Sequence, residues 1–266
     1  MLKNKTIIIT GGTGTFGTNF IEYILKKKIK VKKVIIFSRD EFKQTEMQNR
    51  FANNKFLNLR YFIGDIRDKD RLRMALEDVD IILHAAAIKH VPIAEYNPFE
   101  AIKTNVLGVQ NLIEVALEKN IEKFISLSTD KAAAPVNLYG ATKLCADKLV
   151  TSSQNIKGKK KTIFSVVRYG NVFGSRGSVV PKFIKDNKSV SELKITDLSM
   201  TRFSLSINKA IEVVMWAIKN SVGGEILIPK IPSYKLIDLA KAINPKVKLK
   251  IIGIRQGEKV HEEMIT

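Results

Sequence analysis

The sequence predicts an α/β protein with a doubly wound parallel sheet and a small C-terminal lobe. Through the first 169 residues, short apolar runs alternate with amphipathic helical patterns. This alternation is typical of a parallel sheet with helices on both faces. A glycine-rich loop directly follows the first apolar run. After Gly170 the alternation fades and glycine, proline and serine become frequent, which predicts a smaller lobe packed on the sheet.

The elements of the first part follow in order. Runs rich in β-branched and other apolar residues predict strands over residues 5–10, 33–38, 59–64, 80–86, 123–128 and 162–169. Apolar residues at helical spacing predict helices over 16–28, 67–76, 97–120 and the segment that carries Tyr139 and Lys143. Asn97 and Pro98 suit the N-cap and the first position of the third helix.

Length, charge and cysteine content limit the class of protein. The chain has 266 residues, a single cysteine and a net charge of +19. One cysteine allows no intrachain disulfide, which fits a reducing cytosol. No apolar run is long enough for a signal peptide or a transmembrane helix, so we expect a cytoplasmic protein with no membrane contact. The lysines are spread along the chain and no nucleic-acid-binding motif is present. We therefore expect no nucleic-acid partner. The excess positive charge is expected to cover an ordinary lysine-rich surface, and the alternative is that part of it faces phosphorylated ligands.

Several residues with reactive side chains are expected to be structural. The histidines lack metal-ligand spacing and cysteine partners, so we expect no metal site. These histidines are His84, His90 and His261. No activating base stands beside Cys145 in the sequence, so we expect a buried thiol. Met215 and Trp216 lie in an apolar helical pattern and are expected in the core.

The loop TGGTGTFG, residues 10–17, joins the first strand to the first helix. Its glycines fit two registers, Gly12-Gly14-Gly17 and Gly11-Gly14-Gly17. Either register lets the backbone turn tightly and approach a pyrophosphate at the helix N-terminus. In this position the loop predicts a Rossmann-type dinucleotide site.

The end of the second strand bears on the choice of dinucleotide. Arg39 suits a 2′-phosphate by charge and geometry, whereas an acidic residue such as Asp40 would suit the free ribose of NAD. We expect NADP rather than NAD. Asp65, after the third strand, is placed to accept a hydrogen bond from the adenine amine. The alternative for Asp65 is an ordinary turn with a side-chain cap.

Tyr139 and Lys143 lie one turn apart on the same face of a predicted helix. Tyrosine normally ionises at about pH 10. A neighbouring ammonium group and an oxidised nicotinamide both favour the phenolate, so the pair can take a proton from a sugar hydroxyl as hydride leaves the carbon. Because the pair follows the fifth strand of a dinucleotide fold, it predicts redox chemistry.

Asp130 and Lys131 follow the fifth strand directly, at the edge where parallel sheets bind ligands. One interpretation is a solvated ion pair in a loop. The other is elimination: next to a transient ketone, a base removes a proton from one carbon and an acid expels hydroxide from the next as water. Lys131 must then be neutral, and burial together with Lys143 and the nicotinamide would lower its pKa. Asp130 must hold a proton. The two titrations are coupled, and the sequence does not apportion the protons.

The glycine loop, Tyr139-x-x-x-Lys143 and the preceding Ser128-Thr129 together resemble the extended short-chain dehydrogenase/reductase superfamily. The resemblance selects the register that begins at Gly11 and places Thr129 beside the tyrosine as a catalytic residue. It implies a cofactor site made of Gly11, Thr13, Gly14, Thr15, Phe16, Gly17, Ser38, Arg39, Asp65, Ile66, Ala85, Ala86, Ala87, Tyr139 and Lys143.

A narrower resemblance covers essentially the whole chain. The segments that carry it are 37–44, 62–68, 84–108, 127–149, 167–181, 195–203 and 254–266. They are similar to the inverting UDP-N-acetylglucosamine 4,6-dehydratases of pseudaminic acid, and hence polysaccharide, biosynthesis. This implies NADP, a UDP-sugar substrate, oxidation at C4, water loss across C5–C6 and inversion at C5. Tyr139 and Lys143 would then serve the redox steps, and Asp130 and Lys131 the elimination.

The same resemblance implies the substrate contacts, and the change of sequence pattern after Gly170 predicts the domain division. Lys89 would border the sugar or the phosphates. The UDP portion would contact Asn171, Arg202, Arg255 and Glu258; the alternative for each is an ordinary surface residue. Residues 1–169 would form the dinucleotide-binding domain with the catalytic residues, and residues 170–266 mostly the nucleotide-sugar lobe.

Related members of this family leave alternatives open. One is a UDP-N-acetylhexosamine C4 epimerase with the same cofactor cycle, and another, of a different class, is a non-catalytic NADP-binding regulator. We expect a homo-oligomer. Family members usually continue past the position of Thr266, so outer parts of the small lobe or of an oligomer contact are expected to be missing.

Overall fold

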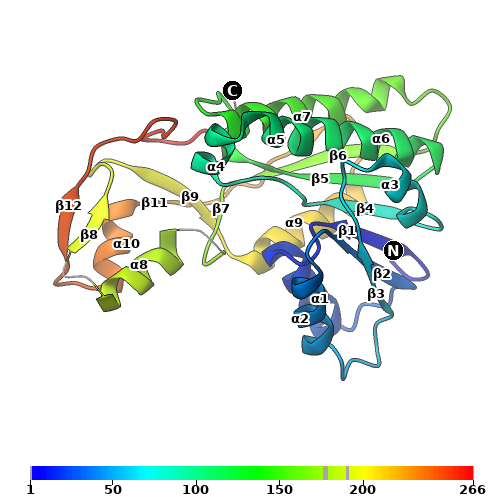
Figure 1. Ribbon diagram of the computed structural model, residues 1–266, viewed down its shortest axis with the longest axis horizontal. Coiled ribbons are helices and arrows are strands. Elements are labelled where there is room, and N and C mark those ends of the chain that lie inside the picture. The colour runs from blue at the N-terminus through cyan, green and yellow to red at the C-terminus, as the bar shows by residue number, and fades with distance from the viewer. Residues whose placement is uncertain (1, 176–178, 190–191, 266) are drawn as a thin grey trace.

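The computed structural model describes residues 2–175, 179–189 and 192–265. Within these residues, seven strands form a central sheet in the order β10-β6-β5-β4-β1-β2-β3 (Figure 1). Every neighbouring pair in it is parallel, so the predicted doubly wound fold is confirmed. The strands are β1 (Thr6–Thr10), β2 (Lys33–Ser38), β3 (Leu59–Ile63), β4 (Ile81–His84), β5 (Lys123–Thr129), β6 (Ile163–Tyr169) and β10 (Ile226–Leu227).

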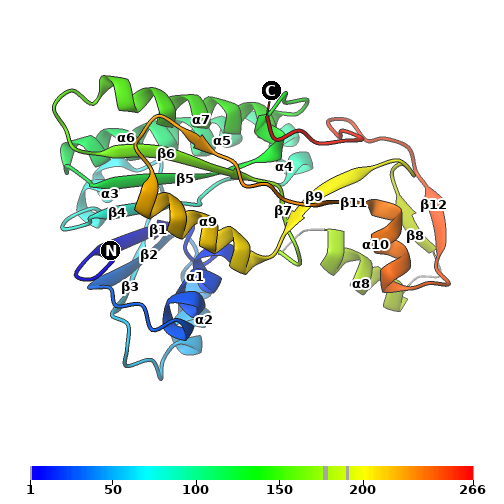
Figure 2. The same ribbon diagram turned by 180° about the vertical axis from the view of Figure 1, so that it is seen from behind.

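Helices cover both faces of this sheet. Along β1, Ile7 and Ile9 pack into one apolar cluster and Ile8 into the other, as expected for a parallel strand buried on both faces. One face is covered by α1 (Thr15–Lys26), α2 (Glu41–Arg50) and α9 (Ile207–Asn220), and the other by α3 (Lys69–Ala75), α6 (Gly108–Glu118) and α7 (Leu138–Ile156). Figure 2 shows α1, α2 and α9 on the face opposite α7.

The later part of the chain divides between the small lobe and the large sheet. A third apolar cluster holds the lobe together. The elements in and next to the lobe are β7 (Asn171–Val172), α8 (Val179–Ser189), β8 (Glu192–Ile195), β9 (Thr201–Leu205), β11 (Ser233–Lys235), α10 (Leu236–Ile243) and β12 (Lys248–Ile251). Between them, α9 and β10 return to the large sheet. After β12 the chain, red in Figure 1, runs back to the start of α7.

The predicted helix over 97–120 is interrupted in the structure. It consists of α5 (Pro98–Ile102), a π-helical turn η1 (Lys103–Leu107) and α6. The turn carries the buried Asn105, whose amide bonds both the N–H and the C=O of Ile88 at 2.8 and 2.9 Å. Such turns are frequent at functional sites. Asn97 precedes α5 but does not cap it with its side chain, because its amide donates instead to the Ile93 carbonyl of α4 (Val91–Tyr96).

Two predictions about the core are wrong. Cys145 is exposed, because on α7 it lies opposite the buried residues Lys143 and Asp147. Trp216 is 54% exposed, since the buried face of α9 is formed by residues two positions away, such as Val214 and Ile218. Met215, next to it, is partly buried against the core. None of the helices in the described part of the chain is long and apolar enough to cross a membrane.

Candidate active site

The glycine-rich loop lies at the carboxyl ends of β1 and β4, beside a pocket of approximately 350 Å³. Gly11 has a left-handed φ of +64°, and a Cβ there would lie 2.9 Å from the backbone of Ala86. At Gly17 a Cβ would lie 2.1 Å from the carbonyl oxygen of Gly12. Only glycine allows these approaches. The predicted residues that line the pocket are Gly11, Thr13, Ser38, Arg39, Asp65, Ile66, Ala86 and Ala87.

The other predicted cofactor residues adjoin this pocket through the backbone. Gly14 is the N-cap of α1, and Thr15, Phe16 and Gly17 form its first turn. The Phe16 ring is buried and stacks on Phe20 with centroids 5.7 Å apart, so only its backbone is available to a ligand. These elements place a helix N-terminus next to the pocket, as a pyrophosphate requires.

The ribose end of the pocket carries two cations and two carboxylates, Arg39, Lys43, Asp40 and Asp65. The Asp40 carboxylate caps α2 by accepting from the Lys43 N–H at 3.0 Å, and it also pairs with the Lys43 ammonium group at 2.5 Å. Arg39, Asp40 and Lys43 all line the pocket. Because Asp40 is engaged by α2, these two cations are the charged groups suited to a phosphate.

Asp65 forms the turn that the sequence left open as an alternative. Its carboxylate accepts from the N–H of Arg67 at 3.0 Å and from the Arg67 guanidinium at 2.6 and 2.9 Å. Arg39 donates to the same carboxylate at 3.4 Å. Although burial acts in the opposite direction, the Arg67 side chain lowers the pKa of Asp65. Asp65 still lines the pocket, next to the buried Ile66.

Tyr139 and Lys143 come from α7 and meet the end of β5. The Thr129 side chain is within hydrogen-bonding reach of the Tyr139 hydroxyl and acts to lower the pKa of this tyrosine. Lys143 is buried and donates to the carbonyl of Leu127 at 2.8 Å. Burial raises the pKa of Tyr139 to about 12, while the positive charge of Lys131 acts to lower it. The pKa of Lys143 is lowered by burial.

Asp130 and Lys131 form a short helical turn at the end of β5, in the same site. The Lys131 ammonium group lies 3.0 Å from the fully buried Asp130 carboxylate and 3.5 Å from the Asn171 amide oxygen. It also lies 3.1 Å from the buried carboxylate of Glu262. The interpretation of a solvated ion pair is therefore wrong.

The expected direction of the Lys131 pKa is also wrong. Burial lowers it, but the Asp130 and Glu262 carboxylates more than offset burial and raise the pKa of Lys131 above its ordinary value. The Glu262 carboxylate comes from a distant part of the chain, so no sequence neighbour of Lys131 indicates it. Lys131 is therefore charged in the protein at neutral pH.

Two buried polar side chains, Asp147 and His84, lie next to this site. Asp147, one turn after Lys143, accepts from Ser128 at 2.7 Å and from Arg168 at 3.0 Å. His84 bonds Thr10 at 2.8 Å. Burial, with the nearby Lys143 charge, lowers the pKa of His84 to about 3, so this imidazole stays neutral. In the part of the chain that the structure describes, no cluster of acidic, histidine and cysteine side chains could hold a metal ion.

The predicted substrate residues lie around this centre but are not all brought together. Asn171 contacts Lys131, as described. Arg202 on β9 donates to the Val260 carbonyl at 3.1 Å. Arg255 and Glu258 share one turn, with the Glu258 N–H donating to the Arg255 carbonyl at 3.1 Å. Lys89 is exposed in the loop after β4.

Comparison with known proteins now identifies the family. Residues 7–266 match the family described as Polysaccharide biosynthesis protein. Over 267 residues, all of this chain and 79% of its relative, the sequence is 55% identical to an inverting UDP-N-acetylglucosamine 4,6-dehydratase of Campylobacter jejuni. The chain belongs to this family. A second relative, a UDP-glucose 4-epimerase of Rickettsia bellii, is 42% identical over all of the chain and 79% of its own length.

Solved structures in and beyond the family share the fold. The X-ray structure of Pen from Bacillus thuringiensis superimposes with a TM-score of 0.94 at 42% identity, over 100% of this chain and 84% of Pen. DesIV from Streptomyces venezuelae, a dTDP-glucose 4,6-dehydratase solved with NAD, gives a TM-score of 0.86 at 20% identity, over 97% of this chain and 88% of its own. The predicted resemblance to inverting dehydratases is confirmed at the level of sequence similarity.

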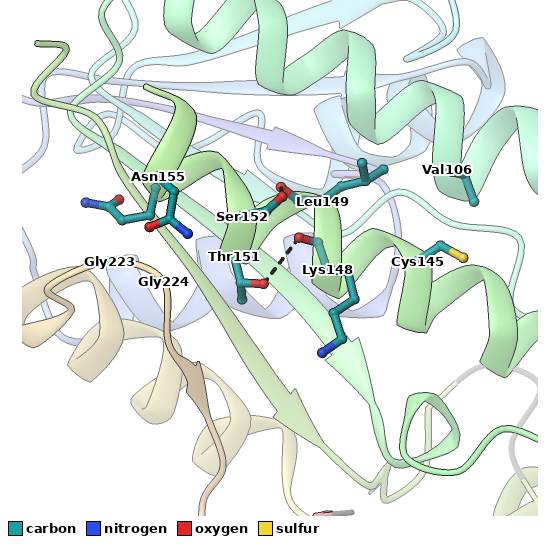
Figure 3. Close-up of a pocket in the computed structure, with 10 residues that line it drawn as sticks. Val106, Cys145, Lys148, Leu149, Thr151, Ser152, Asn155, Gly223 and Gly224 are labelled. Carbon is teal, nitrogen blue, oxygen red and sulfur yellow. Dashed lines mark hydrogen bonds between the residues drawn. The ribbon is translucent and has the colours of Figure 1, made fainter. Parts of the chain in front are cut away.

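A larger depression, of approximately 640 Å³, lies on the opposite, outer face of α7 (Figure 3). Cys145, Lys148 and Ser152 line it, together with the Gly223–Gly224 turn. The side chains of Tyr139 and Lys143 belong to the inner part of the fold, where Lys143 bonds Leu127. This depression shares no lining residue with the pocket beside the glycine-rich loop.

Sequence reasoning missed three residues of this region. Lys43 was not predicted as a pocket residue because α2 has little apolar periodicity. The available signal is Asp40, a recognisable N-cap three residues before it. Asn105 was read as part of a regular helix. Glu262 contacts Lys131 across 131 positions of sequence, and no local pattern reports such a contact.

Proposed function

We propose that the protein is an NADP-dependent lyase that dehydrates UDP-N-acetylglucosamine across C5–C6. The product would be a UDP-4-keto-6-deoxy-hexosamine with inverted configuration at C5. One observation carries the proposal: Lys131 is hydrogen-bonded to Asp130 at 3.0 Å, and its charge acts on Tyr139. Groups for oxidation and for elimination therefore share one buried site. The 55% identity to an inverting dehydratase supports the same assignment.

The cofactor pocket fits a dinucleotide, because a side chain at Gly11 or Gly17 would collide with the backbone that the ligand approaches. A nicotinamide dinucleotide bound there would take a hydride from C4 and return it to C6, so that none is consumed. Tyr139 would take the proton of the C4 hydroxyl. Thr129 would orient the phenol, and Lys143 would hold the ribose side of the cofactor and favour the phenolate.

The elimination would use the pair at the end of β5. Next to the C4 ketone, the C5 hydrogen becomes acidic, and neutral Lys131 would accept it as a proton. Asp130 would give its proton to the C6 hydroxyl, which leaves as water. Because Lys131 is charged at neutral pH, a proton must first pass from Lys131 to Asp130. The 3.0 Å hydrogen bond between them provides the path.

The nucleotide would lie along the small lobe. Arg202 and Arg255 suit the diphosphate by their fork of donors, and Glu258 suits the ribose hydroxyls. Lys89 would border the sugar or the phosphates, and Asn171, which contacts Lys131, would border the sugar end of UDP. Residues 1–169 would then act as the dinucleotide-binding domain and 170–266 mostly as the nucleotide-sugar lobe.

The wider setting is part of the same proposal. We infer a homo-oligomer that works in the cytoplasm in polysaccharide biosynthesis of the pseudaminic acid type. The free Cys145 thiol is compatible with a reducing compartment. NADP is favoured over NAD because Arg39 and Lys43 line the pocket while Asp40 is held by α2.

The test is incubation of the protein with NADP and UDP-N-acetylglucosamine, followed by mass spectrometry and NMR. Loss of the mass of one water with inverted coupling at C5 supports the proposal. The second candidate is a C4 epimerase, favoured by the 42% identity to a UDP-glucose 4-epimerase; it predicts unchanged mass and a galacto product. Cofactor binding with no change in either sugar would indicate a regulator and reject both.

A further inference from the structure

The C-terminal segment, residues 255–265, closes over the turn that carries Asp130 and Lys131. It is fixed there by bonds to three different places. Lys259 donates to the Ala133 carbonyl at 2.9 Å, and Asn137 donates to the Gly257 carbonyl at 2.7 Å. Arg168 donates to the Met264 carbonyl at 3.1 Å. The segment, red in Figure 2, thus belongs to the site although it arrives from the small lobe.

One side chain of this segment reaches Lys131. The Glu262 carboxylate lies 3.1 Å from the Lys131 ammonium group and is only 4% exposed. Its second oxygen, Oε2, is buried and accepts no hydrogen bond from the residues that the structure describes. A charge desolvated to this extent is costly unless it is paired, and Lys131 is its pair.

We propose that Glu262 is a positioning residue of the elimination site, which holds the Lys131 ammonium group while Asp130 exchanges its proton. This role rests on the proposed dehydration. Glu262 acts through Lys131 and need not touch the substrate.

The charges around Lys131 explain why a second carboxylate is needed. The titratable groups that face it are Asp130, Glu262, Tyr139 and Tyr234. After Lys131 has taken the C5 proton, Asp130 still holds its own proton, and with Asp130 alone the new ammonium group would be buried without an anionic partner. With Glu262 present, the ammonium form of Lys131 keeps an ion pair whether or not Asp130 is protonated. The Glu262 carboxylate also helps to raise the pKa of Lys131, so the neutral amine that acts as base is harder to form.

The placement of Glu262 also links the nucleotide to the chemistry. The same segment carries Arg255 and Glu258, the residues proposed for UDP. Glu258 lies four residues before Glu262. Lys259, between them, donates to the Ala133 carbonyl, next to the turn that carries Asp130 and Lys131. Binding of the nucleotide to this segment would therefore hold Glu262 against Lys131.

The test compares pH profiles of kcat for dehydration in the wild type and in Glu262→Gln. Glutamine keeps the size and the acceptor but removes the charge, so neutral Lys131 forms at lower pH. We expect the acidic limb to move down by roughly one to two pH units and kcat at the optimum to fall. The matched control is Glu263→Gln, which removes a 53% exposed carboxylate one residue away. Its profile should coincide with that of the wild type.

A purely structural role would lower kcat equally at every pH, and an unshifted acidic limb in Glu262→Gln overturns the proposal. A second measurement needs no turnover: acetylation of Lys131 against pH, read by mass spectrometry of the protein without substrate. Half-labelling should move to lower pH in Glu262→Gln and not in the control. If Glu262→Gln does not fold, labelling of Lys131 in the wild type tests the proposal. Acetylation of Lys131 at pH values as low as those at which exposed lysines react contradicts the pairing with Glu262. If the wild type makes no dehydrated product, the proposed function fails, and labelling still tests the pairing.

Discussion

The Lys143 ammonium group donates a hydrogen bond of 2.8 Å to the carbonyl of Leu127, two residues before Thr129 on β5. This bond fixes the first turns of α7 against the end of the strand. It therefore sets the position of Tyr139, one turn earlier on α7, against Thr129. The pair proposed for the redox steps and the pair proposed for the elimination are held together by backbone geometry as well as by charge.

Substitution Tyr139→Phe should remove the proton acceptor for the C4 hydroxyl and leave the fold intact. We expect kcat to fall by about 10²–10⁴-fold, the usual contribution of a general base. Reduction of the cofactor on addition of substrate, followed by nicotinamide absorbance, measures this step. The control is Tyr96→Phe, at a tyrosine that is 86% exposed. Equal activity in the two variants would contradict the role of Tyr139.

Substitution Arg39→Ala should weaken NADP binding without weakening NAD binding. Hydrogen bonds to charged groups are each worth about 1.5–3 kcal/mol, so we expect the Kd for NADP to rise roughly tenfold to a hundredfold. Lys43→Ala should act in the same direction. Calorimetric titration with both dinucleotides measures the change. The control is Asp40→Asn, which keeps the helix cap and removes the charge; if this variant alone changes the preference, Asp40 and not Arg39 reads the ribose.

The buried His84 should make the protein sensitive to acid. Its pKa is about 3 in the fold against an ordinary 6.5. Between these values the unfolded chain binds a proton that the folded protein does not. The free energy of unfolding therefore falls as the pH drops through this window, by up to about 1.4 kcal/mol per pH unit from this group.

Urea unfolding at several pH values from neutral to mildly acidic measures this slope. His84→Gln should show a shallower fall than the wild type over the same range. The exposed His90, six residues later, supplies the control His90→Gln, which should keep the wild-type slope. If His84→Gln has the slope of the wild type, protonation of this side chain does not drive the acid sensitivity.

The sheet and its nucleotide loop were predictable because their signals are local. Buried parallel strands are continuous apolar runs, and the loop after β1 needs glycine where a Cβ would meet backbone, as at Gly11. The interruption at Asn105 was not predictable from periodicity. The π-helical turn there is stabilised by bonds to Ile88, which lies on another segment.

The direction of the Lys131 pKa shift was predicted wrongly for a similar reason. Sequence neighbours of Lys131 include one carboxylate, Asp130, whereas the fold adds Glu262 from the far end of the chain. The predicted burial of Trp216 was wrong for the same kind of reason. Its apolar side chain indicated a core position, but it lies on the exposed face of α9. Contacts across the sequence, not residue types, determine these properties.

The division of labour between the two pairs is tested most directly by Lys131→Ala with NADP and UDP-N-acetylglucosamine in a single-turnover experiment. We expect the nicotinamide to become reduced, because Tyr139 and Lys143 are intact, while no product lacking one water is formed. Formation of dehydrated product at the wild-type rate by Lys131→Ala would contradict the account.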